Sequence, residues 1–345
     1  MVVTSFFIQR PGTKVSWDVR EILQSDIKWT TDINFSAGEL TFKLTEVDEG
    51  FIPHEGDIVW FRWDKKPVFR GRIFKYDYDE SENFSITAYD NLRYFKNQDS
   101  LVWPVSTIDQ RFTKVCKLAG LKGKVVSGSK HKLKAEVCDA KSYFDMLKSA
   151  VNATYKATDD HFYLWDNYGT IELRKTGKKI PYYIGDKSSA TGFSYNRSID
   201  SLVNTVLVVR TDKIKKQQTS STAKVKESSG DDAKNTKITA QTVESKNSVT
   251  RYGKLQSVVK AKDKANTAQM KQQALNELKS KGKVAHTLKV KTRGSLNMIP
   301  GYYWPIKFKS LKDIGIGTHY MMITKSTLTF GTTEMTAELE MKVRY

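Results

Sequence analysis

Two parts of the sequence, one near each end, repeat the same order of short alternating segments. Alternation of apolar and polar residues over four to eight positions is typical of half-buried β-strands. The first part contains residues 40–45, a loop with Pro53 and Gly56, and then residues 58–61, 70–78 and 84–89. The second part contains residues 286–292, a loop with Pro300 and Gly301, and then residues 302–306, 319–324 and 335–341. The shared order predicts two related antiparallel β-barrel domains.

A duplicated barrel has a consequence for symmetry. Three copies of a chain with two similar barrels place six similar barrels in a ring. Such a trimer can cover the end of a six-fold tube and still present three-fold symmetry on its other face. The repeat therefore suits an adaptor between six-fold and three-fold symmetry.

The pattern changes to helical spacing between the two β regions. Ile108, Phe112, Val115 and Cys116 recur at helical intervals before Gly120, and a second helix is predicted after Asp139. With 345 residues the chain is long enough for two or three domains. We therefore expect a mainly β fold with an α+β insertion, divided as follows: residues 1–103, a first barrel; residues 104–184, a small α+β domain; residues 185–345, a second barrel with a long polar hairpin at 211–250 and a helix at 263–280.

The composition narrows the classes of protein. The formal net charge is +19, which favours nucleic acid, anionic lipid or an acidic protein as partner. The lysines are spread along the chain, however, and many alternate with apolar residues on predicted strands, as at Lys289 and Lys291. A solvated or subunit-facing strand face explains this spacing better than a phosphate groove. We expect no membrane anchor, because no apolar run approaches the ~20 residues that span a bilayer. The first ten residues predict a strand and not a secretory signal.

Residues suited to catalysis or metal binding do not form a recognisable pattern. The five histidines are far apart and lack metal-ligand spacing. Residues 123–130 (GKVVSGSK) resemble a phosphate-binding loop but transpose its Lys and Ser, so a turn is predicted. Asp159 and Asp160 are adjacent and fit a solvated turn. Cys116 and Cys138 do not form a metal-spaced pair, and Cys116, on the apolar side of a predicted helix, is predicted to be a buried, unreactive thiol. We expect no catalytic residue, no metal site and no cofactor.

Aromatic residues are frequent, with 7 Trp, 16 Tyr and 16 Phe. They could form a stacking surface for sugars or single-stranded nucleic acid, but alternation on strands favours barrel cores and subunit interfaces. The strand beyond Ser201 and the lysines of the polar hairpin are further interface candidates. The predicted protein-interface residues are Trp60, Trp63, Tyr302, Trp304, Lys213, Lys215 and Lys216.

Five stretches in succession resemble the XkdQ/YqbQ-type tail hub proteins of Gram-positive phages and phage-derived particles, relatives of the contractile-tail hub. They are residues 50–61 (GFIPHEGDIVWF), 69–74 (FRGRIF), 88–94 (AYDNLRY), 201–206 (SLVNTV) and 251–256 (RYGKLQ). The resemblance implies that the two barrels are tube-like and that the chain forms a homotrimer in the virion tail baseplate, assembled in the host cytoplasm. It implies contacts with the tail tube protein, the spike or needle protein, a LysM-containing baseplate protein and the tape-measure protein. It implies no catalytic residue.

The sequence thus favours a structural hub that converts six-fold to three-fold symmetry around a channel. Two alternatives stay open. A tail-associated cell-wall hydrolase would need a carboxylate or His/Cys site that the sequence does not display. A basic nucleic-acid-binding module would be consistent with the net charge, although no specific nucleic acid is predicted.

Overall fold

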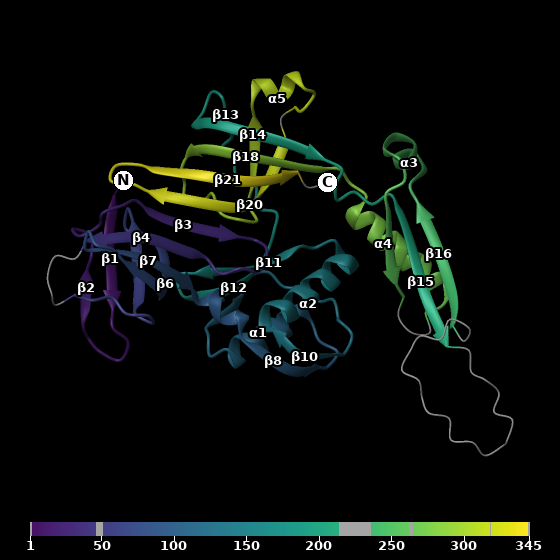
Figure 1. Cartoon of the computed structure of the whole chain (residues 1–345), viewed down its shortest axis with the longest axis horizontal. Coiled ribbons are helices and arrows are strands. Elements are labelled where there is room, and N and C mark those ends of the chain that lie inside the picture. The colour runs from purple at the N-terminus through teal and green to yellow at the C-terminus, as the bar shows by residue number, and fades with distance from the viewer. Residues whose placement is uncertain (1, 46–50, 214–235, 262–264, 318, 344–345) are drawn as a thin grey trace, which may run out of the picture. The chain divides into compact units, whose positions relative to one another are not determined.

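The computed structural model describes residues 2–45, 51–213, 236–261, 265–317 and 319–343, and all structural statements below concern these residues. They form two compact units, one made of residues 1–195 with 287–345 and the other of residues 196–286. Figure 1 labels their helices and strands.

The first unit is built around a 13-stranded, mostly antiparallel sheet. Its strands are β1 (Val3–Gln9), β2 (Ser16–Asp18), β3 (Ile27–Asp32), β4 (Glu39–Thr45), β5 (Ile58–Trp63), β6 (Lys66–Tyr78), β7 (Asn83–Asp90), β13 (Ile184–Gly185), β14 (Ala190–Ser198), β18 (Ala285–Arg293), β19 (Tyr303–Lys307), β20 (His319–Phe330) and β21 (Met335–Val343). The order along the sheet is β14-β18-β21-β20-β3-β4-β7-β6-β5-β1-β2, and β19 and β13 extend it beside β20. A short helix, α5 (Lys309–Asp313), follows β19.

Strand pairing repeats between the two halves of this sheet. In the first half β4 pairs with β7, β7 with β6, and β6 with β5. In the second half β18 pairs with β21, β21 with β20, and β20 with β19. Each half also has a strand outside this group of four, β3 beside β4 and β14 beside β18. The internal repeat seen in the sequence is therefore a repeat of topology.

The repeat extends to individual backbone positions. Gly56 and Gly301 both adopt positive φ angles, 88° and 87°, which glycine tolerates without steric cost. The N–H of Gly56 donates to the carbonyl of Ile73 at 2.8 Å, and the N–H of Gly301 donates to the carbonyl of Ile323 at 2.9 Å. The strands that contain these isoleucines, β6 and β20, both have an irregular register immediately afterwards, between Ile73 and Lys75 and between Ile323 and Lys325. Residues 73–75 and 323–325 are therefore equivalent.

The two halves share one hydrophobic core. β3 pairs with β20, so the sheet runs from one half into the other without a break. At this junction Phe330 is 2% exposed, and its ring lies 5.0 Å from that of Phe61 and 5.2 Å from that of Trp63. The mainly β fold with a small α+β insertion is confirmed, but the two barrel-like halves are joined by one sheet and do not have separate cores.

The α+β insertion has a core of its own within the first unit. It comprises a 3₁₀ helix η1 (Asn91–Lys96), β8 (Gln98–Trp103), α1 (Ile108–Leu118), β9 (Gly123–Val125), β10 (Glu136–Ser142), α2 (Tyr143–Thr158), β11 (Phe162–Asn167) and β12 (Thr170–Lys175). Thr107 caps α1 with a reciprocal capping box to Gln110, which explains where this helix begins. The core of the insertion starts at Leu92, so it includes η1 and β8, which precede the predicted boundary at residue 104.

The second unit is a small α/β module. It contains β15 (Thr205–Lys213), β16 (Thr236–Glu244), α3 (Lys246–Tyr252), β17 (Gln256–Lys260) and α4 (Thr267–Lys281). β15 pairs with β16 in antiparallel and with β17 in parallel fashion, and Val206, Val208 and Met270 form the centre of its core. These residues were expected to be part of a second barrel domain, 185–345; they pack instead as a unit of their own. The other predicted domain boundaries stay predictions.

The predicted burial of Cys116 is confirmed, and Cys138 is buried as well. Cys116 on α1 is 3% exposed and Cys138 on β10 is 1% exposed. Burial raises the pKa of the Cys116 thiol to about 12 and also raises the pKa of Cys138. The thiolate is the reactive species. Packing keeps reagents away from both thiols, and the raised pKa values keep both thiols in the unreactive protonated form.

We expect both cysteines to react with a thiol reagent at pH 8 roughly a hundredfold more slowly in the native protein than after denaturation. Mass spectrometry after timed labelling measures this. An added cysteine at the exposed turn residue Ser81 (Ser81→Cys) is the control and should react at once. Fast labelling of either native cysteine would contradict the packing of α1 and β10.

Candidate assembly interface

The sheet of the first unit has one apolar and one polar face. Inward-facing residues of β3, β4, β7, β18, β20 and β21 form the shared core. The alternate residues of these strands are exposed or half-buried and are mostly Thr, Ser, Lys and Glu. We call this set the polar face: Lys28, Thr30, Asp32, Glu39, Thr41, Lys43, Ser85, Thr87, Tyr89, Lys289, Lys291, Arg293, Lys325, Thr327, Thr329, Thr336, Glu338, Glu340 and Lys342.

Side chains on the polar face bind one another across neighbouring strands. The hydroxyl oxygens of Thr30 and Thr327 lie 3.0 Å apart at the junction of the two halves. The ammonium of Lys291 lies 3.0 Å from a carboxylate oxygen of Glu338. Since opposite charges and hydroxyls alternate, this face stays hydrated and does not present one sign of charge.

A shallow hollow of about 510 Å³ lies on the second half of this face. Its lining includes Lys289, Lys291, Lys325 and Glu338. The hollow is open to solvent and its charged groups are exposed, so it lacks the convergent buried polar groups of a small-molecule site. It is a part of the polar face and not a pocket for a ligand.

Among the described strands, β14 and part of β6 have a neighbouring strand of the sheet on one side only. β14 is the terminal strand at one end of the sheet and pairs only with β18. β6 pairs with β5 through residues 66–72, but residues 75–78 pair with β7 alone. Unpaired edges expose backbone N–H and C=O groups and are templates for another strand.

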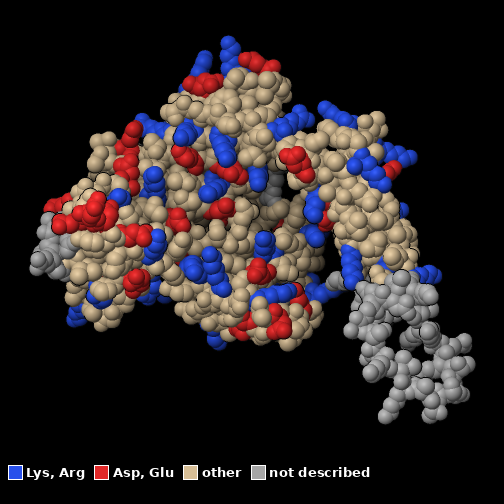
Figure 2. Space-filling model, in the orientation of Figure 1, with Lys and Arg blue, Asp and Glu red and all other residues tan. Residues whose placement is uncertain are grey.

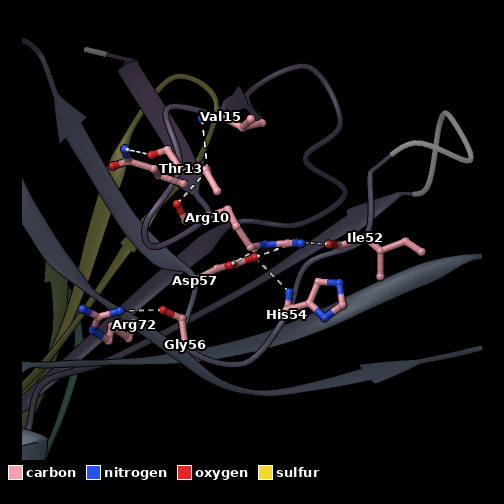
Figure 3. A network of polar contacts seen from close by, with 9 residues as sticks. Arg10, Thr13, Val15, Ile52, His54, Gly56, Asp57 and Arg72 are labelled. Carbon is pink, nitrogen blue, oxygen red and sulfur yellow. Dashed lines mark hydrogen bonds and ion pairs between the residues drawn. The ribbon is translucent and has the colours of Figure 1, made fainter.

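A buried ion pair fixes the loop before β5 (Figure 3). The guanidinium of Arg10 donates to both carboxylate oxygens of Asp57, at 3.0 and 3.3 Å, and to the carbonyl of Ile52 at 2.9 Å. The N–H of His54 donates to Asp57 at 3.0 Å, and Arg72 donates to the carbonyl of Gly56 at 2.8 Å. Asp57 is only 1% exposed, so this network joins the end of β1 to the start of β5 and has no room for a substrate.

Asp57→Ala should lower the free energy of unfolding by about 2 kcal/mol. Removing one partner of a buried pair leaves the other charge uncompensated, and the exposed fraction of Arg10, 35%, moderates this cost. Urea unfolding measures the change, and Glu55→Ala at an exposed position of the same loop is the control. Equal stability of the two variants would contradict a structural role for Asp57.

The predicted interface aromatics fall into two groups. Trp63 and Trp304 are 1% and 4% exposed, so their rings are part of the core. Trp60 and Tyr302 are half-buried. Trp60 stacks on Phe7 with ring centroids 5.5 Å apart, and Lys178 covers the ring of Tyr302 at 4.6 Å. The four rings therefore do not form one aromatic surface.

The predicted interface lysines are mostly outside the described residues. Lys213 is the last residue of β15, and Lys215 and Lys216 lie outside the described part. Their role in an interface stays a prediction. The hairpin expected at 211–250 is described only where β15 and β16 pair, up to Lys213 and from Thr236.

Positive charge is concentrated in the second unit of the chain. Residues 196–286 contain 19 Lys and Arg against 8 Asp and Glu, which gives +11 of the total +19. On the face of the molecule shown in Figure 2, Lys and Arg are interspersed with Asp and Glu. The face of the first unit seen in Figure 2 therefore shows no continuous basic patch of the kind that is typical of nucleic-acid-binding proteins.

Two buried carboxylates were not singled out by sequence reasoning. Asp90 ends β7 and accepts N–H groups of Gly38 at 2.8 Å and Leu92 at 3.0 Å. Asp166 on β11 accepts those of Gly169 at 2.6 Å and Asn91 at 2.8 Å. Burial and the charge of Asp166 raise the pKa of Asp90 well above its ordinary value, and burial raises that of Asp166 to about 6. Each carboxylate accepts hydrogen bonds from two backbone N–H groups. Because these bonds join residues of the sheet to residues of the α+β insertion, the pair holds the two parts together.

The described residues contain no group of three His, Cys, Asp or Glu side chains that could hold a metal ion. None of the described helices is long and apolar enough to cross a membrane.

Sequence reasoning also missed the free edges of β14 and β6. The sequence carries no local signal for them: the repeated Ile-x-Lys at residues 73–75 and 323–325 marks the same irregularity in β6 and β20, but β20 is paired with β3 there.

Comparisons with known proteins agree with this architecture. The chain is 27% identical over 238 residues to the phage-like element PBSX protein XkdQ of Bacillus subtilis (strain 168). The matched region covers 68% of this chain and 66% of XkdQ, so the chain spans just under two thirds of the length of XkdQ. It is 25% identical over 274 residues to YqbQ of the same organism, covering 78% of this chain and 76% of YqbQ.

Solved structures with this fold include two prophage tail proteins. The 43 kDa tail protein of prophage MuSo2 from Shewanella oneidensis has a TM-score of 0.67 at 12% identity, covering 99% of this chain and 98% of that one. Prophage tail protein gp18 from Listeria monocytogenes EGD-e has a TM-score of 0.62 at 13% identity, covering 99% and 95%. A family model described as YQBQ-like matches residues 27–342. The resemblance stated from the sequence is thus confirmed, and the chain belongs to the YQBQ-like family.

Proposed function

We propose that this chain is a structural hub of a phage-type tail baseplate, and that it acts as a homotrimer joining a six-fold tail tube to a three-fold spike. One observation carries the proposal: the two halves of the sheet repeat the same strand pairing and are joined edge to edge by β3 and β20. A chain with two equivalent modules supplies six modules from three copies. The relatives and the fold support a tail role, since XkdQ is a phage-like element protein and the solved neighbours are prophage tail proteins.

The polar face is the surface that suits the wall of a central channel. Its Thr, Ser, Lys and Glu side chains hydrate the passage, whereas the apolar face is covered by the shared core. In this proposal the partners are the tail tube protein, the spike or needle protein, a LysM-containing baseplate protein and the tape-measure protein. The chain itself performs no catalysis.

The test is the oligomeric mass of the purified protein by light scattering, at low and at high salt. A trimer under both conditions supports the hub and indicates an interface that does not depend on charge. A trimer that dissociates at high salt supports the hub with a charged interface. A monomer at high protein concentration under both conditions argues against the self-assembling hub.

The basic second unit favours a second candidate, a nucleic-acid-binding module. Its +11 charge is the only observation that supports it. A steep fall of DNA affinity with salt, together with equal affinity for unrelated sequences, would show charge attraction alone. Discrimination between sequences at constant salt would favour a genuine nucleic-acid function.

A further inference from the structure

We propose that a group of four arginines on the first half of the sheet binds an acidic segment of another protein. We call this group the arginine surface: Arg62 on β5, Arg70 and Arg72 on β6, and Arg93 on η1. The inference goes beyond the proposed hub, because it concerns a surface of the single chain and does not depend on how many copies assemble.

Strand pairing gathers these side chains on the face of the sheet opposite the shared core. Arg70 lies opposite Trp60, and Arg72 lies opposite Ile58 on one side and Tyr89 on the other. Residues two apart on a strand point the same way and are separated by about 7 Å. Arg70 and Arg72 therefore place two positive charges side by side.

The α+β insertion borders the same surface. The guanidinium carbon of Arg62 lies 6.0 Å from the ring centre of Tyr168, in the turn between β11 and β12. A Cβ atom on Gly169 of this turn would lie 3.4 Å from Cδ of Arg70. Arg93 follows β7 on η1, and its guanidinium carbon lies 5.0 Å from the ring centre of Phe74. The sheet and the insertion thus build the surface together.

None of the four arginines forms an ion pair with a described residue. Arg72 donates a hydrogen bond only to an uncharged group, the carbonyl of Gly56, at 2.8 Å (Figure 3). The first unit also contains arginines that are paired with carboxylates at 2.6–3.0 Å: Arg10, Arg20, Arg111 and Arg174. The arginine surface therefore differs from these structural arginines in lacking its counter-charge.

Acidic side chains of the neighbouring strands β4 and β11 are engaged elsewhere. Glu39 accepts a hydrogen bond from the hydroxyl of Tyr89 at 2.9 Å. Asp166 is buried, and its two oxygens accept backbone N–H groups at 2.6 and 2.8 Å. Like charges that lie close together repel one another, so an acidic partner would relieve the repulsion among the arginines.

The internal repeat shows that the fold does not require these arginines. β20 pairs with β19 and β21 as β6 pairs with β5 and β7. Counted back from the equivalent irregularities, the two arginines of β6 correspond to Tyr320 and Met322 of β20. Uncharged residues therefore support the same strand pairing in the second half, and the arginines of the first half are available for binding.

The rings of the surface favour an acidic protein segment over a single-stranded nucleic acid. Nucleic-acid bases stack on open ring faces. Here arginines cover the rings of Tyr168 and Phe74, and Phe7 stacks on Trp60 with ring centroids 5.5 Å apart. A guanidinium that lies on a ring keeps its N–H edge free, and this edge matches a carboxylate with two parallel hydrogen bonds.

The test is the fluorescence anisotropy of a labelled acidic peptide titrated with the full chain at low salt. The peptide alternates Glu and Ser, so that in extended form its carboxylates recur every ~7 Å, the spacing of Arg70 and Arg72. Arg62→Gln combined with Arg70→Gln removes two exposed charges from the arginine surface. Lys289→Gln combined with Arg293→Gln is the matched control, because it removes the same charge from two exposed positions of β18. A single-stranded oligothymidine of equal charge is the second probe.

We expect the arginine variant to bind the peptide about tenfold more weakly than the wild type, and the control variant to lose less than about twofold. Equal losses in both variants would show attraction by net charge alone and would overturn the proposal. Undetectable binding of the peptide by the wild type would also overturn it. So would tighter binding of the oligothymidine than of the peptide, lost in the arginine variant.

Light scattering of the same samples separates this proposal from the proposed hub. A change of oligomeric mass in the arginine variant alone would show that a second copy occupies the surface, which contradicts an acidic partner. An unchanged mass, whether that of a monomer or of a trimer, together with the selective loss of peptide binding supports the proposal. A monomeric wild type would therefore count against the hub and leave the arginine surface standing.

Discussion

Phe330→Ala should lower the free energy of unfolding by about 3–5 kcal/mol, the usual cost of removing a buried aromatic ring. Phe330 is 2% exposed at the end of β20, and its ring meets Phe61 and Trp63 of β5 edge-on. These contacts join the second half of the sheet to the first. The substitution therefore weakens the junction between the halves and not only one strand.

Urea unfolding followed by tryptophan fluorescence measures this effect, because Trp63 reports directly on the contact. Protein concentration must be held constant, since the stability of an oligomer depends on it. Tyr320→Ala is the matched control, an aromatic residue of the same strand that is 43% exposed. A loss for Phe330→Ala no larger than that for Tyr320→Ala would show that the halves do not depend on a shared core.

The sequence predicted the strands of the repeat well because period-two alternation reports directly on burial. β4, β5, β7, β18 and β21 all contain the alternating segments from which they were expected. Helix positions in the insertion also followed from apolar spacing, as with α1 at Ile108, Phe112 and Val115. Each of these signals is local, so a single sequence contains it.

Non-local features could not be predicted in the same way. Alternation says that Trp63 has one buried face but not that Phe330, far away in the chain, covers it. For the same reason two barrel domains were expected where the pairing of β3 with β20 makes one continuous sheet. The second unit was missed because its core is small, with Val206, Val208 and Met270 among polar residues.

The candidate interface shows the same limit. Trp63 and Trp304 were selected by residue type, yet the structure places both in the core. The edges of β14 and β6 carry no unusual composition, and only the pairing of the other strands reveals that they are open. Interfaces built from backbone edges are therefore harder to predict from residue types than interfaces built from side chains.

Between pH 4 and pH 7 the carboxylates of Asp90 and Asp166 should make the protein less stable as the pH rises. Their folded-state pKa values are raised above the ordinary value of 3.8, to about 6 for Asp166 and also upward for Asp90. In this range the folded state therefore binds more protons than the unfolded state. The stabilisation that this proton binding gives is fully present below pH 4 and is lost as the pH rises past 6. For Asp166 the change corresponds to about 3 kcal/mol.

Asp166→Asn isolates this effect, because a neutral amide cannot lose a proton and relieves the repulsion on Asp90. The variant loses one acceptor for the N–H of Asn91 or Gly169, so its absolute stability is a poor measure. The slope of unfolding free energy against pH is the better one. We expect the slope between pH 4.5 and pH 7 to flatten in Asp166→Asn and to be unchanged in Asp313→Asn, an exposed carboxylate on α5. If the slope of unfolding free energy against pH were the same in wild type and in both variants, the buried pair would not set the pH dependence. Other carboxylates would then set it.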